Sequence, residues 1–136
     1  MFFSMFLNIL NEKQKNLFLK LAIKAAETND EVTSEEEAMI DAFALEMQIE
    51  PIHSTDDALD EILQALKNIS TIRDYRIITF EILGILFSDS EFDDKEKDFI
   101  KEICDTFGIT KETVDEMIVN LNEYTNLFNK IVKLIL

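Results

Sequence analysis

Helix-breaking residues, cysteine and tryptophan are almost missing from this sequence, and each absence excludes a class of structure. The 136 residues include two glycines, one proline, one cysteine and no tryptophan. So few helix breakers favour an all-α fold over sheets joined by tight turns. The single cysteine, Cys104, excludes an internal disulfide and a cysteine-rich metal site, and it suits a reducing cytoplasm.

Long apolar runs are also missing. No run reaches the roughly 20 residues that a transmembrane helix needs. Residues 1–10 are apolar, but they lack the basic start and the small-residue cleavage site of a signal peptide. We therefore expect a soluble, cytoplasmic protein that is able to touch a membrane from outside. Its length fits a single domain, 1–136, with a core of its own.

Basic residues are scarce, and the net charge at pH 7 is −15. Residues 25–66 contain thirteen carboxylates and no lysine or arginine. This charge repels nucleic-acid phosphates, so no nucleic acid is expected among the partners. Cations or basic proteins fit the acidic middle better, and a solvated face without a ligand is the alternative.

Against these absences stands one internal repeat. Residues 27–50 align without a gap with residues 87–110, sixty positions later. Glu31 falls on Glu91 and Glu36 on Glu96, while apolar positions stay apolar. A repeat at a fixed offset indicates one supersecondary unit used twice. Each copy is predicted to be a helical hairpin with an acidic loop.

Capping signals and apolar spacing place the helices. Capping boxes at Asn11, Thr33 and Asp93 predict helix starts, the first helix running over residues 12–28. Ser54 with Asp57 predicts another start, as does Ser70 or Thr71, and Thr110 opens a helix followed by a separate terminal helix. The sequence predicts a compact all-α bundle of about six to seven helices, built on two repeated helix-loop-helix hairpins with repeat halves at about 12–50 and 71–110.

The second acidic loop is the better candidate for a cation site. Asp89, Glu91 and Glu96 supply hard oxygen ligands of the kind that divalent cations prefer. An EF-hand is excluded, because counting from Asp89 puts Asp94 where that loop needs glycine and Ile100 where it needs glutamate. A divalent cation, the one cofactor considered, would therefore need another geometry. Weaker equivalents in the first loop are Asn29, Glu31 and Glu36.

Helix capping offers a purely structural explanation for part of this pattern. A carboxylate three residues after an N-cap accepts a backbone hydrogen bond and opposes the helix dipole, typically for ~1 kcal/mol. Glu36 and Glu96 have that position. Capping explains Asp89, Glu91, Asn29 and Glu31 less well, so these remain the stronger functional candidates.

The doubled segment resembles the TerB-like tellurite-resistance family. The residues that carry the resemblance are AETNDEVTSEE at 26–36 and LFSDSEFDDKE at 86–96, within a similarity that covers most of residues 12–122. The family's aspartate corresponds to Asn29 in the first copy and to Asp89 in the second, and its glycine is replaced in both. The resemblance implies a helical bundle in a bacterial tellurite-resistance or stress-response system, with metal sensing and membrane-associated protein partners.

Catalysis finds little support in the sequence. His53 lies beside Pro51 in a connecting segment, and Cys104 lies on a predicted buried helix face. Neither is accompanied by a phosphate-binding loop or a nucleophile–base arrangement. We therefore expect no enzyme, but a TerB-like interaction or metal-sensing module.

The two ends of the chain support an alternative function. Residues 1–10 and 127–136 are apolar and have lysines nearby, which predicts a membrane-peripheral adaptor on anionic lipid. Completion of the core by both ends is the simpler reading. Dimerisation through Phe2, Phe3 and Phe6 is a third, so the oligomeric state stays open.

Overall fold

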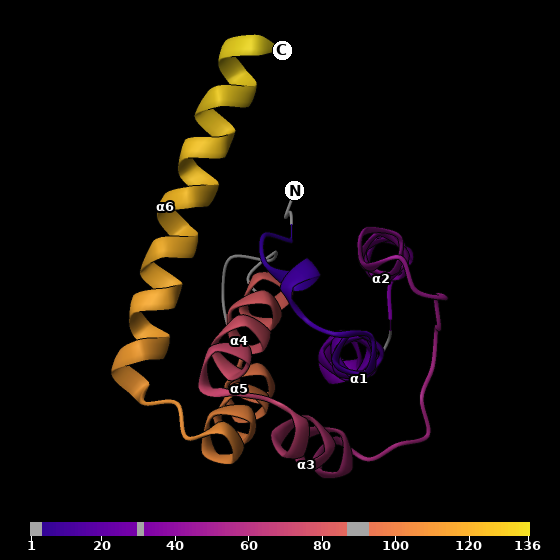
Figure 1. Cartoon of the computed structure of the whole chain (residues 1–136). Coiled ribbons are helices and arrows are strands. Elements are labelled where there is room, and N and C mark those ends of the chain that lie inside the picture. The colour runs from indigo at the N-terminus through magenta and orange to yellow at the C-terminus, as the bar shows by residue number, and fades with distance from the viewer. Residues whose placement is uncertain (1–3, 30–31, 87–92) are drawn as a thin grey trace.

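The fold was analysed in a computed structural model, which describes residues 4–29, 32–86 and 93–136 (Figure 1). These residues form six α-helices and two short 3-10 helices, and the expected compact all-α bundle is confirmed. The 3-10 helices are η1 (Leu7–Ile9) and η2 (Glu27–Asn29). The α-helices are α1 (Glu12–Ala26), α2 (Ser34–Met47), α3 (Leu59–Ile69), α4 (Ile72–Leu86), α5 (Asp94–Phe107) and α6 (Lys111–Ile135).

Helix α1 lies at the centre of the bundle and contacts α2, α3 and α4. Helix α5 packs on α4 and α3, so α4 is also covered on several sides. Such burial needs apolar side chains around most of each helix, which the compositions of α1 and α4 supply. The largest fully buried side chains are Phe18, Phe43, Leu7, Leu19, Leu21, Ile23, Met47, Ile62, Leu63, Leu66, Ile78 and Ile82.

The starts of α1 and α4 are joined by one hydrogen-bonded network. Asn11 and Gln14 form the predicted capping box of α1. Thr71 caps α4, since its Oγ1 accepts from the Asp74 backbone N–H while Asp74 Oδ2 accepts from the Thr71 backbone N–H. The Gln14 side chain donates to Asp74 Oδ2 at 3.0 Å. Burial works to raise the pKa of Asp74, but the Thr71 and Gln14 hydrogen bonds hold it below its ordinary value.

Helix boundaries recur at the sixty-residue offset of the sequence repeat. Helices α4 and α5 begin and end sixty residues after α1 and α2. Both α2 and α5 start with a capping box and end at a residue in the left-handed conformation. The interpretation of this offset as one unit used twice stays a prediction.

Two expectations about helix boundaries are wrong. Helix α3 begins at Leu59, after an Ala58 cap with no side-chain hydrogen bond, and Ser54 does not cap it. The separate terminal helix does not exist either, because α6 continues through residues 122–126 to Ile135. No glycine or proline interrupts that stretch, and intrahelical hydrogen bonding therefore continues.

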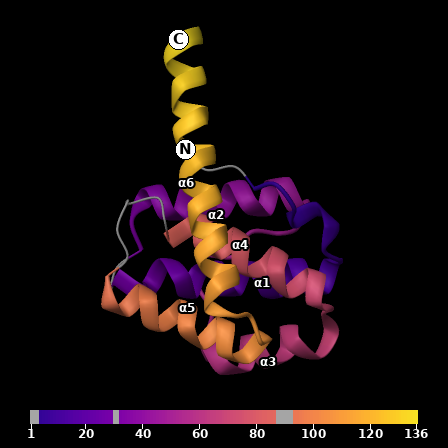
Figure 2. The same cartoon turned by 90° about the vertical axis from the view of Figure 1, so that its left-hand side faces the viewer.

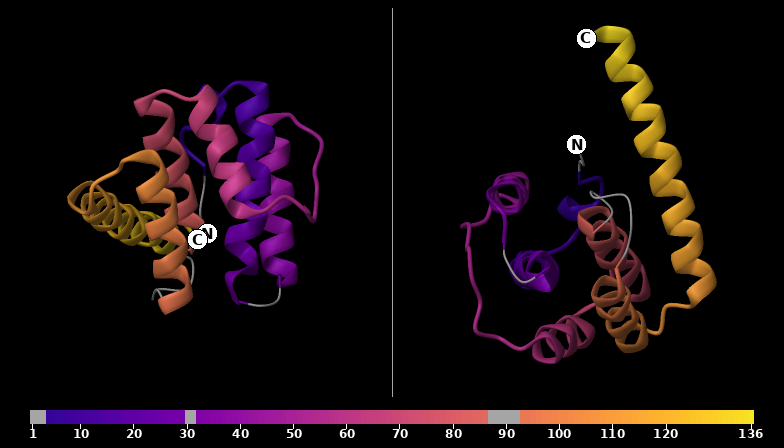
Figure 3. Two further views of the ribbon diagram at one scale, coloured as in Figure 1. Left: turned by 90° about the horizontal axis from the view of Figure 1, so that it is seen from below. Right: turned by 180° about the vertical axis from the view of Figure 1, so that it is seen from behind.

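Helix α6 crosses the other helices steeply and extends past them (Figures 1 and 2). Its first half packs on α4, with Val114 and Leu121 buried. Residues 124–135, here called the projecting half, extend beyond the bundle in both views. The view from behind shows the same separation (Figure 3). The expectation that the C-terminal end completes the core is therefore wrong.

The left-handed residues that end α2 and α5 are Gln48 and Gly108, with φ of 58° and 70°. In both turns the next residue donates its N–H back to the helix, Ile49 to the carbonyl of Ala44 and Ile109 to that of Cys104. A side chain in this conformation costs roughly 1–2 kcal/mol, which glycine avoids.

We predict that Gln48→Gly raises the free energy of unfolding by about 1 kcal/mol, because it removes this conformational cost. The reciprocal change, Gly108→Gln, should lower it by a similar amount, since a Cβ at Gly108 meets no atom within 4 Å and only the backbone cost acts. Urea unfolding of both variants measures the two shifts. A loss of stability in Gln48→Gly would contradict the prediction.

Candidate functional site

The predicted cation ligands divide into those that the structure describes and those outside it. Asp89, Glu91 and Glu31 lie outside the described residues. Asn29 ends η2, immediately before one of the undescribed segments. Only Glu36 and Glu96 can be placed with their side chains, at the starts of α2 and α5.

Both described glutamates take part in helix capping. Glu36 Oε1 accepts from the Thr33 backbone N–H at 3.0 Å, and Glu96 Oε1 accepts from that of Asp93 at 3.2 Å. Glu96 is buried, at 4% exposure. Within the described ranges, no group of three histidine, cysteine, aspartate or glutamate side chains could hold a metal ion. The structure thus supports the capping role, and the cation site stays a prediction centred on Asp89.

The residues considered for catalysis lie in ordinary surroundings. His53 is exposed in the segment after α2, and its Nε2 lies 2.7 Å from Asp41 Oδ1. Cys104 is half-buried on α5, where burial and the neighbouring Asp105 raise the pKa of its thiol to about 11. At neutral pH this thiol is almost entirely protonated and therefore a weak nucleophile.

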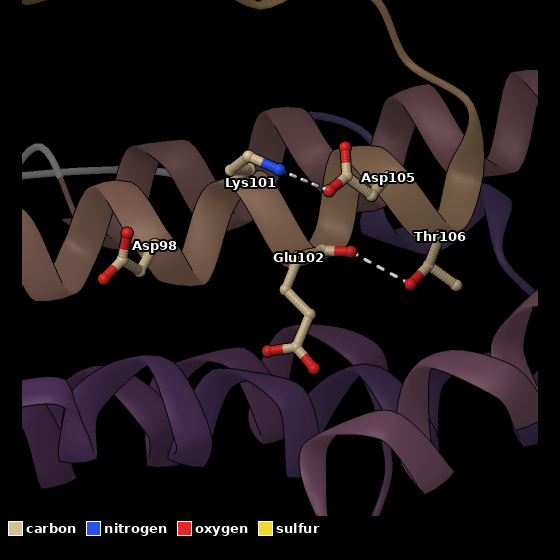
Figure 4. A pocket seen from close by; sticks show the side chains of 5 residues that line it. All are labelled: Asp98, Lys101, Glu102, Asp105 and Thr106. Atoms are coloured by element: carbon tan, nitrogen blue, oxygen red, sulfur yellow. Dashed lines mark hydrogen bonds and ion pairs between the residues drawn. The ribbon is translucent and has the colours of Figure 1, made fainter.

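A shallow hollow of about 440 Å³ lies on the outer face of α5 (Figure 4). Two of its four charged side chains pair within the helix, since Lys101 Nζ bonds Asp105 Oδ2 at 2.8 Å and the pKa of Lys101 is raised by that contact. The Thr106 hydroxyl donates to the Glu102 backbone carbonyl. In Figure 4 the Glu102 and Asp98 carboxylates point in different directions. The hollow offers no convergent set of polar groups for catalysis.

Two apolar grooves flank the first half of α6. The α5/α6 groove, about 600 Å³, has Cys104 and Ile118 among its lining residues and three lysines at its edges. The α4/α6 groove, about 590 Å³, has two arginines, Arg73 and Arg76, at its edge. The apolar lining of the α4/α6 groove consists of Phe6, Ile9, Ile72, Ile77, Phe80 and Met117.

The projecting half of α6 exposes large apolar side chains. Leu127 is 57% exposed, Ile131 45%, Leu134 87% and Ile135 72%. Tyr124 and Phe128, on the same half, stack with their ring centroids 6.5 Å apart. Contiguous exposed apolar surface of this kind marks an interaction site more often than a solvated face.

From the sequence, these residues are expected on a separate helix that could pack on the core, which differs from the structure. One signal could have shown otherwise. The apolar spacing continues through Leu121, Tyr124 and Phe128 without interruption, as one continuous helix requires. The length of the helix agrees with this signal. A helix of 25 residues is about 37 Å long, which is more than the width of a small helical bundle.

Comparisons with known proteins do not decide the family. No protein-family model matches the chain, and no curated protein or solved structure is significantly similar to it. The TerB-like resemblance therefore stays a prediction that rests on the two acidic segments. In the part of the chain that the structure describes, no helix meets the length and apolarity needed to cross a bilayer.

Glu81 is a buried carboxylate on α4 that holds the N-terminal segment. Its Oε1 accepts from the backbone N–H groups of Met5 and Phe6, at 3.1 and 3.3 Å. Its Oε2 is buried and has no hydrogen-bond partner among the described residues. Burial raises the pKa of Glu81 to about 7, the two backbone donors oppose this rise, and Glu46 adds to it.

We predict that this carboxyl group makes stability depend on pH. The folded-state pKa near 7 lies above the ordinary value of 4.5, so the contribution is complete below pH 4.5 and is lost as the pH rises through 7. Relative to Glu81→Gln, the wild-type free energy of unfolding should fall by roughly 3 kcal/mol over that range. Urea unfolding of both proteins from pH 4.5 to about 8 measures the difference. Parallel curves would contradict the assignment.

The cation site makes a separate prediction. If Asp89 is a ligand, calorimetric titration with Ca²⁺, Mg²⁺ or Zn²⁺ should give a saturable heat that Asp89→Ala abolishes. Asp98→Ala, on the exposed face of α5, is the matched control and should leave the heat unchanged. A wild-type protein without saturable heat would eliminate the site.

Proposed function

We propose that the protein is a non-enzymatic helical interaction module that docks a partner through the projecting half of α6. The observation that carries this proposal is the exposure of Leu127, Ile131, Leu134 and Ile135 along a helix that has left its own bundle. A helix that offers an apolar face to a groove or to another helix is a recurrent mode of recognition.

The energies involved support a docking role. Full burial of a leucine or isoleucine side chain contributes roughly 1.5–3 kcal/mol, so these four partly exposed side chains would contribute on the order of 4–8 kcal/mol together. Association costs about 4–15 kcal/mol in lost freedom of motion. The projecting half alone is therefore marginal, and a stable complex needs additional apolar surface, which the adjoining α4/α6 groove offers.

A non-enzymatic role is supported by the state of the reactive side chains. The raised pKa of Cys104 keeps its thiol protonated, and His53 is exposed beside Asp41. In the hollow on α5, the carboxylates of Asp98 and Glu102 point in different directions. By contrast, the exposed apolar surface lies on α6.

The TerB-like resemblance suggests where such a module would work. We propose a component of a bacterial tellurite-resistance or stress-response system in the cytoplasm, in which α6 binds a protein partner. The acidic loop around Asp89 would add cation sensing. The doubled acidic segment supports this placement.

A membrane-peripheral adaptor is the second candidate. Met5, Phe6 and Ile9 are exposed, and the start of the described chain, before η1, lies toward the same side of the molecule as the projecting half (Figure 1). Lys130 and Lys133 would attract anionic lipid for about 1 kcal/mol each. The excess of carboxylates in the rest of the chain opposes that attraction, which makes a protein partner the stronger proposal.

Photo-crosslinking in native cells tests the docking role. A benzoylphenylalanine in place of Leu134 should give a discrete covalent protein adduct, because this side chain would lie in the interface. The same group in place of Asn129, on the opposite side of α6, should give little or none. Equal, diffuse labelling from both positions would contradict docking through the apolar face. Co-sedimentation with anionic vesicles and no protein adduct would favour the second candidate.

A further inference from the structure

We infer that the partner of the projecting half is a second copy of this chain, in a twofold antiparallel pair of α6 helices. In this pair each projecting half lies along the partner's α4/α6 groove. The inference rests on the proposed docking role of α6 and names the partner. Three features of the described residues carry it: the spacing of apolar residues, the distribution of charge along α6, and the position of the groove.

The apolar residues of α6 alternate in steps of three and four. This spacing is the 3.5-residue repeat of helices that pack side by side, whereas an isolated amphipathic helix follows a 3.6-residue repeat. The first three members pack on the chain's own bundle, with Val114 and Leu121 buried and Met117 half-buried. The same seam then continues into the projecting half. Its members are Val114, Met117, Leu121, Tyr124, Phe128, Ile131 and Ile135.

The seam is symmetric about its middle. Tyr124 is the central one of its seven members. The distances in residues from Tyr124 to corresponding members on its two sides are equal or differ by one. A helix with this property can pair with an inverted copy of itself, as an isologous twofold interface requires. In the first half, Met117 is the member left to the partner, because Val114 and Leu121 are buried in the chain's own bundle. An antiparallel pair centred near Tyr124 would place Ile131 opposite Met117 of the partner subunit.

Charge distribution selects the antiparallel direction. Residues 111–123 contain Glu112, Asp115, Glu116 and Glu123 against Lys111, a net charge of −3. The projecting half contains Lys130 and Lys133 and no acid, a net charge of +2. Antiparallel pairing sets each basic half beside an acidic half, whereas parallel pairing sets like charges together. The same polarity stabilises α6 itself through the helix dipole.

The α4/α6 groove provides the surface that the projecting half would cover. Met117 lines this groove, so the groove runs beside the acidic first half of α6. Phe6, Ile9 and Ile72 on its walls are 41%, 50% and 70% exposed. Lys133 lies on the face of α6 opposite Ile131 and Ile135, whereas Lys130 lies about 100° around the helix from Ile131, as Glu116 does from Met117. At the groove edge, Arg73 Nη2 lies 3.6 Å from Asp74 Oδ1. Apolar surface therefore meets apolar surface without opposed like charges.

The mass of the full chain in solution tests the pairing. We expect sedimentation equilibrium to give twice the chain mass of 15.8 kDa at micromolar concentration. Ile131→Asp should weaken the dimer at least about a hundredfold, as a central interface residue does. Asn126→Asp adds the same charge on the opposite face of the projecting half, where Asn126 is exposed, and should change the constant less than about threefold. Circular dichroism checks that both variants keep their helix content.

Single cysteines test the direction in a Cys104→Ala background. Under mild oxidation, Tyr124→Cys near the twofold axis should form a disulfide between copies. Ile135→Cys should not, because antiparallel pairing places the two copies of residue 135 at opposite ends of the seam. The reverse pattern, with Ile135→Cys crosslinked and Tyr124→Cys not, would overturn the antiparallel pair.

The outcomes also separate this inference from the proposed docking role. A chain that stays at 15.8 kDa while Leu134 crosslinks to a different protein would overturn self-pairing and leave docking through α6 intact. A monomer that gives no adduct at Leu134 would overturn both. A dimer that Ile131→Asp does not weaken would overturn the α6 interface.

Discussion

The packing of α1 between α2, α3 and α4 is the constraint on which the remaining structure depends. A helix covered on three sides must be apolar around most of its circumference, and α1 has Phe18, Leu19, Leu21, Ala22 and Ile23 all essentially buried. Helix α4 is similarly enclosed, because α1, α5 and α6 each take part of its surface. The four lysines of α1 take its less buried positions, Lys13, Lys15, Lys20 and Lys24. The same enclosure explains why Glu81 stands out, as a fully buried carboxyl group on α4.

The sequence predicted the fold well where local chemistry decides it. Capping boxes at Asn11, Thr33 and Asp93, and the cap at Thr110, mark helix starts at the expected residues because side chain and backbone bond within one turn. The start of α3 was missed, since Ala58 offers no side-chain oxygen and Ser54 resembles a cap without acting as one. Local signals cannot choose between a helix start after Ser54 and one at Leu59, because the start is decided by the tertiary packing of Leu59, Ile62 and Leu63.

The candidate site was less predictable, for a different physical reason. An apolar residue reads the same in a sequence whether its partner lies in the same chain or in another. Leu127 and Ile131 therefore resembled core residues, although the steep crossing of α6 carries them past the bundle. Conversely, the acidic residues seemed the obvious functional feature, yet Glu36 and Glu96 are both used in capping. Placement in space decides which of the two patterns remains available to a partner.

One corner of the bundle has a consequence for how the molecule opens. The Gln14 carboxamide caps α1, and its nitrogen also reaches the Ile69 carbonyl at 3.4 Å, the Ser70 hydroxyl at 3.0 Å and the Asp74 carboxylate at 3.0 Å. The first turn of α1, the last turn of α3 and the first turn of α4 thus share a single side chain. Fraying of the first turn of α1 removes a donor from both other turns, and fraying of either of those removes an acceptor from Gln14. Their backbone amides should exchange with solvent in one concerted opening, which makes three segments distant in sequence a single cooperative unit.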